Sequence, residues 1–263
     1  MKKLFCFISF YFLLVLGLKA QIISKTDSTN LWKMTLGVHV FSKQKVVQNY
    51  EPVPGLRIYS RPTYGFAMEL TRFIRLNTKL SSSIGLRIGL MPSDVSLNIA
   101  ENITRNGLSY DTRNKHSLPY LAFKGLVNFN LWHKDKFSIV QSIGSSFVLV
   151  PRGFSNYDII SLSSGVEVPY YSSIGLYNPT NLPFFSALSE TSLICTKKGE
   201  KKWILSLSLE LAPKDVIASE YIFYSTKGEL KGTMTRRYQQ VGIHYGWFFI
   251  LKKKRKIKLL EED

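Results

Sequence analysis

The chain has 263 residues and a formal net charge of +17, from 35 Lys and Arg against 18 Asp and Glu, and 45% of its residues are hydrophobic. After residue 20 no stretch approaches the 18 or more consecutive apolar residues of a transmembrane helix, so any membrane insertion must use strands. Of its two cysteines only Cys195 lies beyond residue 20, which excludes both a disulfide framework and a thiolate metal site from that part of the chain.

The first 20 residues have the three parts of a secretory signal peptide. Lys2 and Lys3 precede an apolar run from Leu4 to Leu18, and Ala20 comes before Gln21. We predict cleavage after Ala20, because the run is shorter than the roughly 20 apolar residues of an uncleaved membrane anchor. Cleavage removes three lysines and no acid, so the charge of the mature chain is +14.

Eight later segments of about ten residues alternate between apolar and polar or small residues. This period-two pattern predicts β-strands long enough to cross a membrane at a tilt. The sixth segment has no clear face assignment, and a segment such as 96–104 could extend a strand or add one. The segments are Trp32–Phe41, Tyr64–Thr71, Leu80–Leu90, Leu121–Leu131, Phe137–Leu149, Phe184–Thr196, Trp203–Leu211 and Tyr238–Ile250.

The connections between these segments alternate in length. Those at 42–63, 92–116, 150–183 and 213–237 are long, and those at 76–79, 133–136 and 197–202 are short. A membrane barrel has short periplasmic turns and long extracellular loops. The fold class we predict is therefore an all-β, antiparallel up-and-down transmembrane barrel of about eight strands.

A soluble lipocalin also has eight strands, and would turn its apolar face inward. Here one face of the strands carries large apolar residues and the other carries Gly, Ser and scattered charges. Because eight strands enclose only enough room for side chains, we expect the small and polar face inside and the bulky face against lipid. Aromatic residues near the strand ends fit an interfacial girdle, namely Trp32, Tyr64, Trp132, Phe137, Trp203 and Phe249.

The last segment carries the most specific motif. Polar Gln240, Gly242, and the aromatic Tyr245, Trp247 and Phe249 recur at fixed spacing. This pattern resembles the carboxy-terminal β-signal by which outer-membrane barrel proteins are recognised by the insertion machinery. The resemblance implies that the final strand closes the barrel and also carries the signal that directs the protein to the insertion machinery.

With this motif, the chain resembles the outer-membrane β-barrel superfamily of Gram-negative bacteria, in particular the small OmpA/OmpX-type barrels and related proteins of Bacteroidetes. The resemblance covers roughly residues 30–250 and implies location in the cell outer membrane. The domains we expect are a signal peptide at 1–20, a short periplasmic segment at 21–30, the barrel at 31–251 and a charged periplasmic tail at 252–263, solvated or bound to anionic lipid head groups.

Charged residues on the small-residue face are the candidates for a site. Buried charges must be paired or neutralised, so we expect a network that fills the lumen, with a gated pore or proton path as the alternative. His39 and His244 lie on strands that meet when the barrel closes, but two histidines without a third ligand do not make a metal site, and we predict no metal or cofactor. The expected network is Lys33, His39, Glu69, Arg87, Lys124, Glu210 and His244.

We expect a non-enzymatic envelope or surface-interaction protein. The alternatives are a component or accessory of a protein secretion system and a lipid A-modifying enzyme. The enzyme has one candidate nucleophile and base, Ser117 and His116, but adjacent strand residues point to opposite faces and no orienting acid is evident. Tyrosines in the long connections could contact a partner, or could extend strands above the membrane and pack on each other.

The expected partners follow from export and from charge. They are outer-membrane lipid including lipopolysaccharide, the barrel insertion machinery, and an extracellular or periplasmic protein. Nucleic acid is the usual partner of so basic a chain, but an exported protein rarely meets it.

Overall fold

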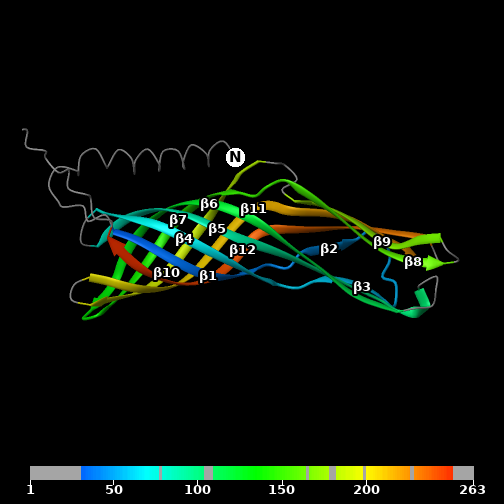
Figure 1. The fold of residues 1–263 in the computed structure, drawn as a ribbon, viewed down its shortest axis with the longest axis horizontal. Helices are drawn as coiled ribbons and strands as arrows, with labels where there is room; N and C mark the ends of the chain where they lie inside the picture. The colour runs from blue at the N-terminus through cyan, green and yellow to red at the C-terminus, as the bar shows by residue number, and fades with distance from the viewer. Residues whose placement is uncertain are drawn as a thin grey trace, which may run out of the picture.

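Eight antiparallel strands form a closed ring in the computed structural model, which describes residues 31–250 apart from 77–78, 104–108, 164–165, 178–181, 198–199 and 226–227. Each strand pairs with both of its neighbours, and the last strand pairs with the first, so the barrel has no open edge (Figure 1). In ring order the strands are β1 (Leu31–Phe41), β4 (Thr63–Arg75), β5 (Leu80–Ile99), β6 (Tyr110–Lys134), β7 (Phe137–Leu149), β10 (Phe184–Lys197), β11 (Glu200–Ser225) and β12 (Gly228–Ile250).

These strands contain the eight predicted segments, and the three short connections occur where the sequence places them. The ambiguous segment at 184–196 is β10, and residues 96–99 lengthen β5. Between β6 and β7 the chain turns at Asp135, whose φ of 48° lies in the left-handed region that Asp tolerates in tight hairpins. The signal peptide, the segment at 21–30 and the tail lie outside the described residues.

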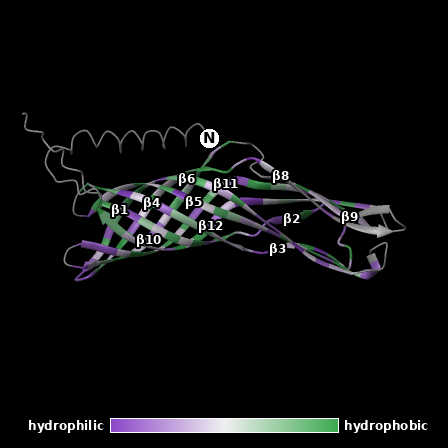
Figure 2. Ribbon diagram, in the orientation of Figure 1, coloured by the Kyte–Doolittle hydropathy of each residue, from purple (hydrophilic) through white to green (hydrophobic). Residues whose placement is uncertain are grey.

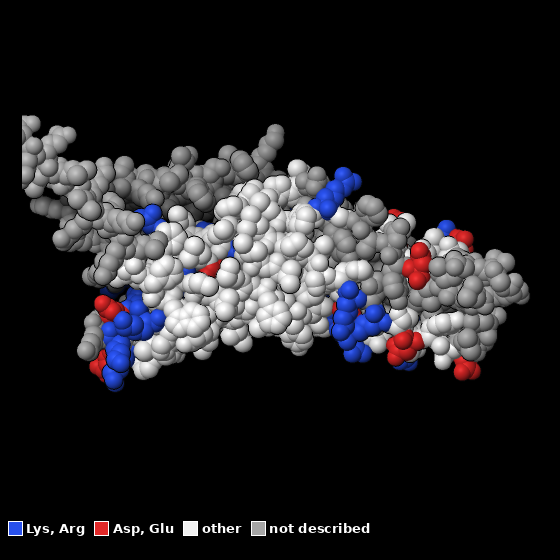
Figure 3. Space-filling view, in the orientation of Figure 1, with Lys and Arg blue, Asp and Glu red and all other residues white. Residues whose placement is uncertain are grey.

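The barrel turns its apolar side chains outward. On β12, for example, Val241, Ile243, Tyr245 and Trp247 are exposed, whereas the residues that alternate with them are buried. Hydrophobic and hydrophilic residues alternate along the barrel strands in Figure 2, and in Figure 3 the visible face of the barrel is mainly uncharged, with most of its charged groups near the two ends and on the extension. This is the surface of a barrel surrounded by lipid, not of a lipocalin. No helix among the described residues has the length and apolar character to cross a membrane.

One face assignment changes within β6. Strict alternation puts Trp132 inside if Leu131 is outside, yet both are exposed, at 45% and 65%. The register between β6 and β7 shifts between Asn130 and Trp132, and this bulge turns the indole outward. The girdle position predicted for Trp132 therefore depends on an irregularity that alternation does not reveal.

The long connections are mostly strands, which agrees with the alternative that they extend strands above the membrane. The strands β5, β6, β11 and β12 have 20 to 26 residues, about twice the 9–11 that cross a bilayer. They continue past the barrel into an extension made of two sheets. One sheet has the order β2 (Lys45–Gln48), β12, β11, β9 (Val166–Tyr177), β8 (Gly153–Ser163), and the other contains β3 (Leu56–Ser60), β5 and β6; a short 3-10 turn, Glu101–Ile103, follows β5.

A hydrophobic core between its two sheets explains why the extension is ordered. Its buried members come from β3, β5, β9, β11 and β12, and are Leu56, Ile58, Leu97, Ile99, Tyr171, Tyr221, Phe223 and Met234. Burying such a core offsets the entropy of ordering long loops.

Candidate functional site

Six charged side chains from six of the eight barrel strands meet in the lumen, and we call them the ion cluster. All are at most 4% exposed. Alternation along each strand aims them inward, where the ring brings together residues up to 157 positions apart in sequence. The members are Lys33 on β1, Glu69 on β4, Arg87 on β5, Lys124 on β6, Glu190 on β10 and Glu210 on β11.

Glu69 is the centre of the ion cluster. Its carboxylate lies 2.6 Å from the Nζ of Lys124, 3.3 Å from the Nε of Arg87 and 3.4 Å from the Nζ of Lys33. Thr71 donates a further hydrogen bond to it at 2.8 Å. Glu69 therefore holds three cations from three other strands in one arrangement.

The two other carboxylates complete the pairing. Glu190 accepts hydrogen bonds from Lys33 at 3.1 Å and from Lys124 at 3.3 Å. Glu210 lies 2.5 Å from Nη1 of Arg87. Three cations and three carboxylates therefore balance, as buried charges require.

Glu190 is the functional residue that sequence analysis missed. Its strand, β10, carries Ser189 and Thr191 on the outward face, so polarity does not separate that face from the inward Ser186, Glu190 and Ser192. A search for the inward acid needed to balance Lys33, Arg87 and Lys124 would have found it.

The two histidines lie side by side, and one ring nitrogen of each is within hydrogen-bond distance of a neighbouring side chain. Their rings meet edge to face with centroids 4.7 Å apart. His39 Nδ1 is 2.7 Å from the side-chain oxygen of Gln240, and His244 Nε2 is 3.0 Å from the hydroxyl of Ser208. Among the described residues, no group of three or more His, Cys, Asp or Glu could hold a metal ion.

Four aromatic rings fill the lumen on the extension side of the ion cluster, and we call them the aromatic plug. The ring of Tyr238 contacts those of Phe41, Tyr120 and Phe184. Phe41 also contacts Tyr120, and the ring centroids in these pairs are 5.2 to 6.4 Å apart. All four are at most 6% exposed. Gln240 joins the two layers, because its amide donates to Glu210 at 2.6 Å and to the hydroxyl of Tyr238 at 2.7 Å.

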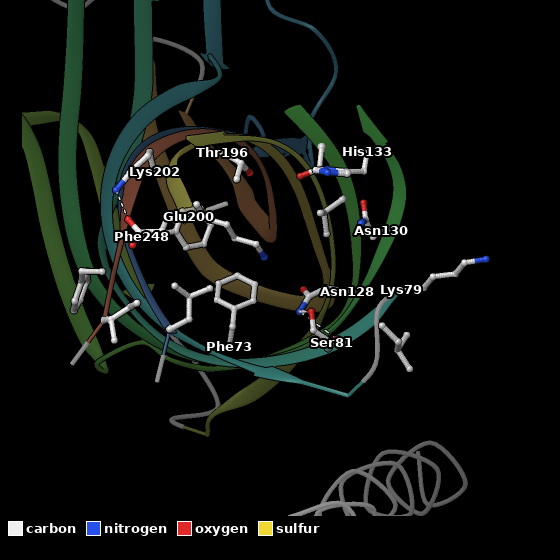
Figure 4. A pocket seen from close by; sticks show the side chains of 17 residues that line it. Phe73, Lys79, Ser81, Asn128, Asn130, His133, Thr196, Glu200, Lys202 and Phe248 are labelled. Atoms are coloured by element: carbon white, nitrogen blue, oxygen red, sulfur yellow. Dashed lines mark hydrogen bonds and ion pairs between the residues drawn. The ribbon is translucent and has the colours of Figure 1, made fainter. Parts of the chain in front are cut away.

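A vestibule of about 770 Å³ opens the barrel at the end that carries the short turns (Figure 4). The rings of Phe73 and Phe248 lie on its wall with their centroids 5.7 Å apart. The Nζ of Lys201 lies 5.5 Å from the first centroid and 5.6 Å from the second. Lys33 of the ion cluster lies 5.8 Å from Phe73, so the cluster adjoins the vestibule on its inner side.

Tyrosines of the long connections contribute to the extension core. Tyr171 and Tyr221 are each 1% exposed with stacked rings, and Tyr50 lies with its hydroxyl 3.3 Å from that of Tyr221. Burial raises the pKa of Tyr221 and of Tyr50, which keeps both phenols neutral. Tyr50, Tyr171 and Tyr221 therefore pack on one another above the barrel, which is one of the two roles expected for the tyrosines of the long connections. The side chains of Tyr157, Tyr170 and Tyr177 are outside the described part of the structure.

The residues proposed for catalysis do not converge. His116 and Ser117 follow each other on β6, where His116 is half-buried and Ser117 is exposed, so they face opposite sides of the sheet. Cys195 is half-buried and is a free thiol.

The residues of the predicted β-signal lie on both faces of β12. Tyr245, Trp247 and Phe249 are exposed on the apolar exterior, and Gln240 and Gly242 are inside. Gly242 faces His39 and His244, which leave no room for a side chain, since an added Cβ would come within 3.0 Å of both rings.

Comparisons with known proteins give structural likeness only. No family model matches the chain, and no curated protein resembles it in sequence. The outer membrane protein OprG from Pseudomonas aeruginosa is similar at a TM-score of 0.41 and 8% identity, over 85% of this chain and 98% of OprG. Ail, the attachment invasion locus protein of Yersinia pestis, has a TM-score of 0.32 and 9% identity over 84% and 99% of the two chains.

The outer membrane protein AlkL has a TM-score of 0.34 and 10% identity, over 89% of this chain and 96% of AlkL. The closed ring, the apolar exterior and the charge-paired interior are what define the architecture. This chain has the fold of an outer-membrane β-barrel protein.

Proposed function

We propose that this protein is a non-enzymatic, non-conducting barrel of the outer membrane that presents its two-sheet extension to the cell exterior for surface interaction. The observation that carries the proposal is the contrast between a filled lumen and an ordered extension. The ion cluster and the aromatic plug occupy the interior, whereas four strands continue beyond the lipid-facing belt.

The direction of the chain in the membrane follows from the turns. Short turns face the periplasm in bacterial barrels, and the long connections face outward. The extension therefore lies outside the cell and the vestibule faces the periplasm. The predicted signal peptide, with cleavage after Ala20, supplies the export that this placement requires.

We expect wild-type protein in a planar lipid bilayer to give no regular current steps. Arg87 and Glu210 bridge the lumen at 2.5 Å, and a neutral cluster offers ions no vacant site. Single-channel recording tests this, with a large porin prepared in the same detergent as the positive control. Reproducible steps from the wild-type barrel would favour a gated pore and overturn the non-conducting part of the proposal.

Shortening the β8–β9 hairpin tests the role of the extension. A variant in which a short Gly-Asn turn replaces residues 154–176 should keep the heat-modifiable gel shift of a folded barrel, because no barrel strand is changed. Cells that carry it should sediment more slowly from suspension and be retained less on a glass surface than wild-type cells.

The matched control changes the opposite end of the barrel. Lys134→Gln with Lys136→Gln alters the turn between β6 and β7 and should leave cell sedimentation and retention at wild-type levels. Equal attachment by all three strains, with equal amounts of folded barrel, would argue against a surface-interaction role for this hairpin.

A further inference from the structure

Three cations lie on adjacent strands at the outer end of the barrel. Arg237 belongs to β12, Lys43 follows β1, and Arg61 precedes β4. The residues on either side of Lys43 fix its position, since Ser42 N donates to Gln239 O at 3.0 Å and Gln44 N donates to Ser60 Oγ at 3.0 Å. Lys43 is thus held between the strand of Arg237 and the segment of Arg61. Neighbouring strands are about 4.8 Å apart, so the three backbones span about 10 Å.

The row of cations begins where the lipid-facing belt ends. Val241, Val40 and Tyr64 are in register across the same three strands and are exposed on the apolar exterior. The cations lie three or four residues farther out, a distance of about 10–13 Å along the strands, or about 8–10 Å above the belt at a tilt of roughly 40°. The head-group layer is about 5–8 Å thick on each side of the hydrocarbon core, so this height corresponds to its outer part, within reach of long Lys and Arg side chains.

The side chains in this row are exposed, and one is held in place. The guanidinium of Arg61 lies 5.3 Å from the ring centroid of Tyr59 and donates to its hydroxyl at 3.2 Å. The Nε of Arg237 lies 3.8 Å from Oδ1 of Asp215, and both side chains are about half exposed. Three cations and this one acid leave a net charge of +2 on a narrow face, and Figure 3 shows basic side chains gathered at this end of the barrel.

We propose that Arg237, Lys43 and Arg61 form a binding site for the phosphate groups of an outer-leaflet glycolipid. The inference rests on the proposed outward direction of the extension, which places the row in the outer leaflet. Arginine offers paired donors to phosphate oxygens, and lysine adds a point charge. Three cations side by side match a head group with more than one phosphate better than a phospholipid with a single one.

The test measures lipid binding to the full chain in detergent by native mass spectrometry. The probes are lipid A with its phosphates, the same lipid A after enzymatic removal of its phosphates, and phosphatidylglycerol. Lys43→Gln, Arg61→Gln and Arg237→Gln are combined in one variant. The control combines Lys134→Gln, Lys136→Gln and Lys197→Gln, which are exposed at the periplasmic end.

We expect the triple variant to bind phosphorylated lipid A about 30-fold more weakly. Each basic residue near a lipid surface contributes about 1 kcal/mol, Asp215 offsets one of the three, and 1.4 kcal/mol corresponds to tenfold. The control variant should bind like wild type, and Lys43→Arg alone, which keeps the positive charge, should preserve affinity. Wild type should discriminate against the dephosphorylated lipid and against phosphatidylglycerol.

Three outcomes would overturn the inference: unchanged affinity in the triple variant, equal binding of dephosphorylated lipid A, or equal binding of phosphatidylglycerol. The triple variant leaves the β8–β9 hairpin and the lumen intact, so its gel shift and its attachment to glass report on the proposed function separately. A wild-type protein absent from the outer-membrane fraction would instead refute the placement on which both proposals depend.

Discussion

Replacing Glu69 by Gln is expected to cost about 3–5 kcal/mol of unfolding free energy, the range found when one partner of a buried ion pair is removed. The substitution preserves the shape of the side chain and removes only its charge. Lys33, Arg87 and Lys124 would then share two carboxylates in a lumen where none is more than 4% exposed. The midpoint of urea unfolding, followed by the gel shift of the folded form in detergent micelles, measures the loss.

Two further variants separate burial from charge in this experiment. Glu200→Gln removes an ion pair with Lys202 in which both side chains are about half exposed or more, and should cost at most about 1 kcal/mol. Glu69→Gln combined with Lys124→Gln restores the balance of charge and should recover part of the loss, as a double-mutant cycle would reveal. If Glu69→Gln cost no more than Glu200→Gln, water would have to reach the ion cluster.

The barrel itself could be predicted because its physics is local. A strand with lipid on one side and a packed lumen on the other must alternate between apolar and polar or small residues. The faces of Leu86, Arg87 and Ile88 can therefore be assigned from the sequence of their own strand alone. The lengths of the connections then determine the order of the strands around the ring, since short turns join adjacent strands. The lumen positions of Lys33, Glu69 and Arg87 follow from the same alternation.

The parts that could not be predicted depend on contacts between distant residues. The sequence left open whether the long connections extend the strands, because the extension is stabilised by packing between two sheets, as where Tyr171 stacks on Tyr221, and no single segment shows this. Glu190 lies on a strand whose outward face is itself polar, so only its partners Lys33 and Lys124 identify its role. The bulge at Trp132 is likewise a property of the pairing of β6 with β7.

The last strand leads to the other large effect. Tyr245→Asn combined with Trp247→Asn is expected to lower the amount of folded protein in the outer-membrane fraction by about tenfold or more. Both side chains are 46–47% exposed on the lipid-facing surface, and both belong to the motif that resembles the insertion signal. The heat-modifiable band in isolated outer membranes measures the folded amount. The prediction requires that losing the insertion signal reduce the amount of folded protein more than placing two amide side chains against lipid does.

The register of the barrel provides the control that separates these two effects. Leu36 and Met34 on β1 pair directly with Tyr245 and Trp247, so they lie at the same depth, and both are exposed to lipid. Leu36→Asn with Met34→Asn therefore imposes a similar lipid-facing cost at the same closing seam without touching the motif, and should leave most of the protein folded. Equal loss in the two double variants would mean that the aromatic residues of β12 act only through contact with lipid. A selective loss in the β12 variant would mean that the strand which closes the ring also determines whether it is inserted.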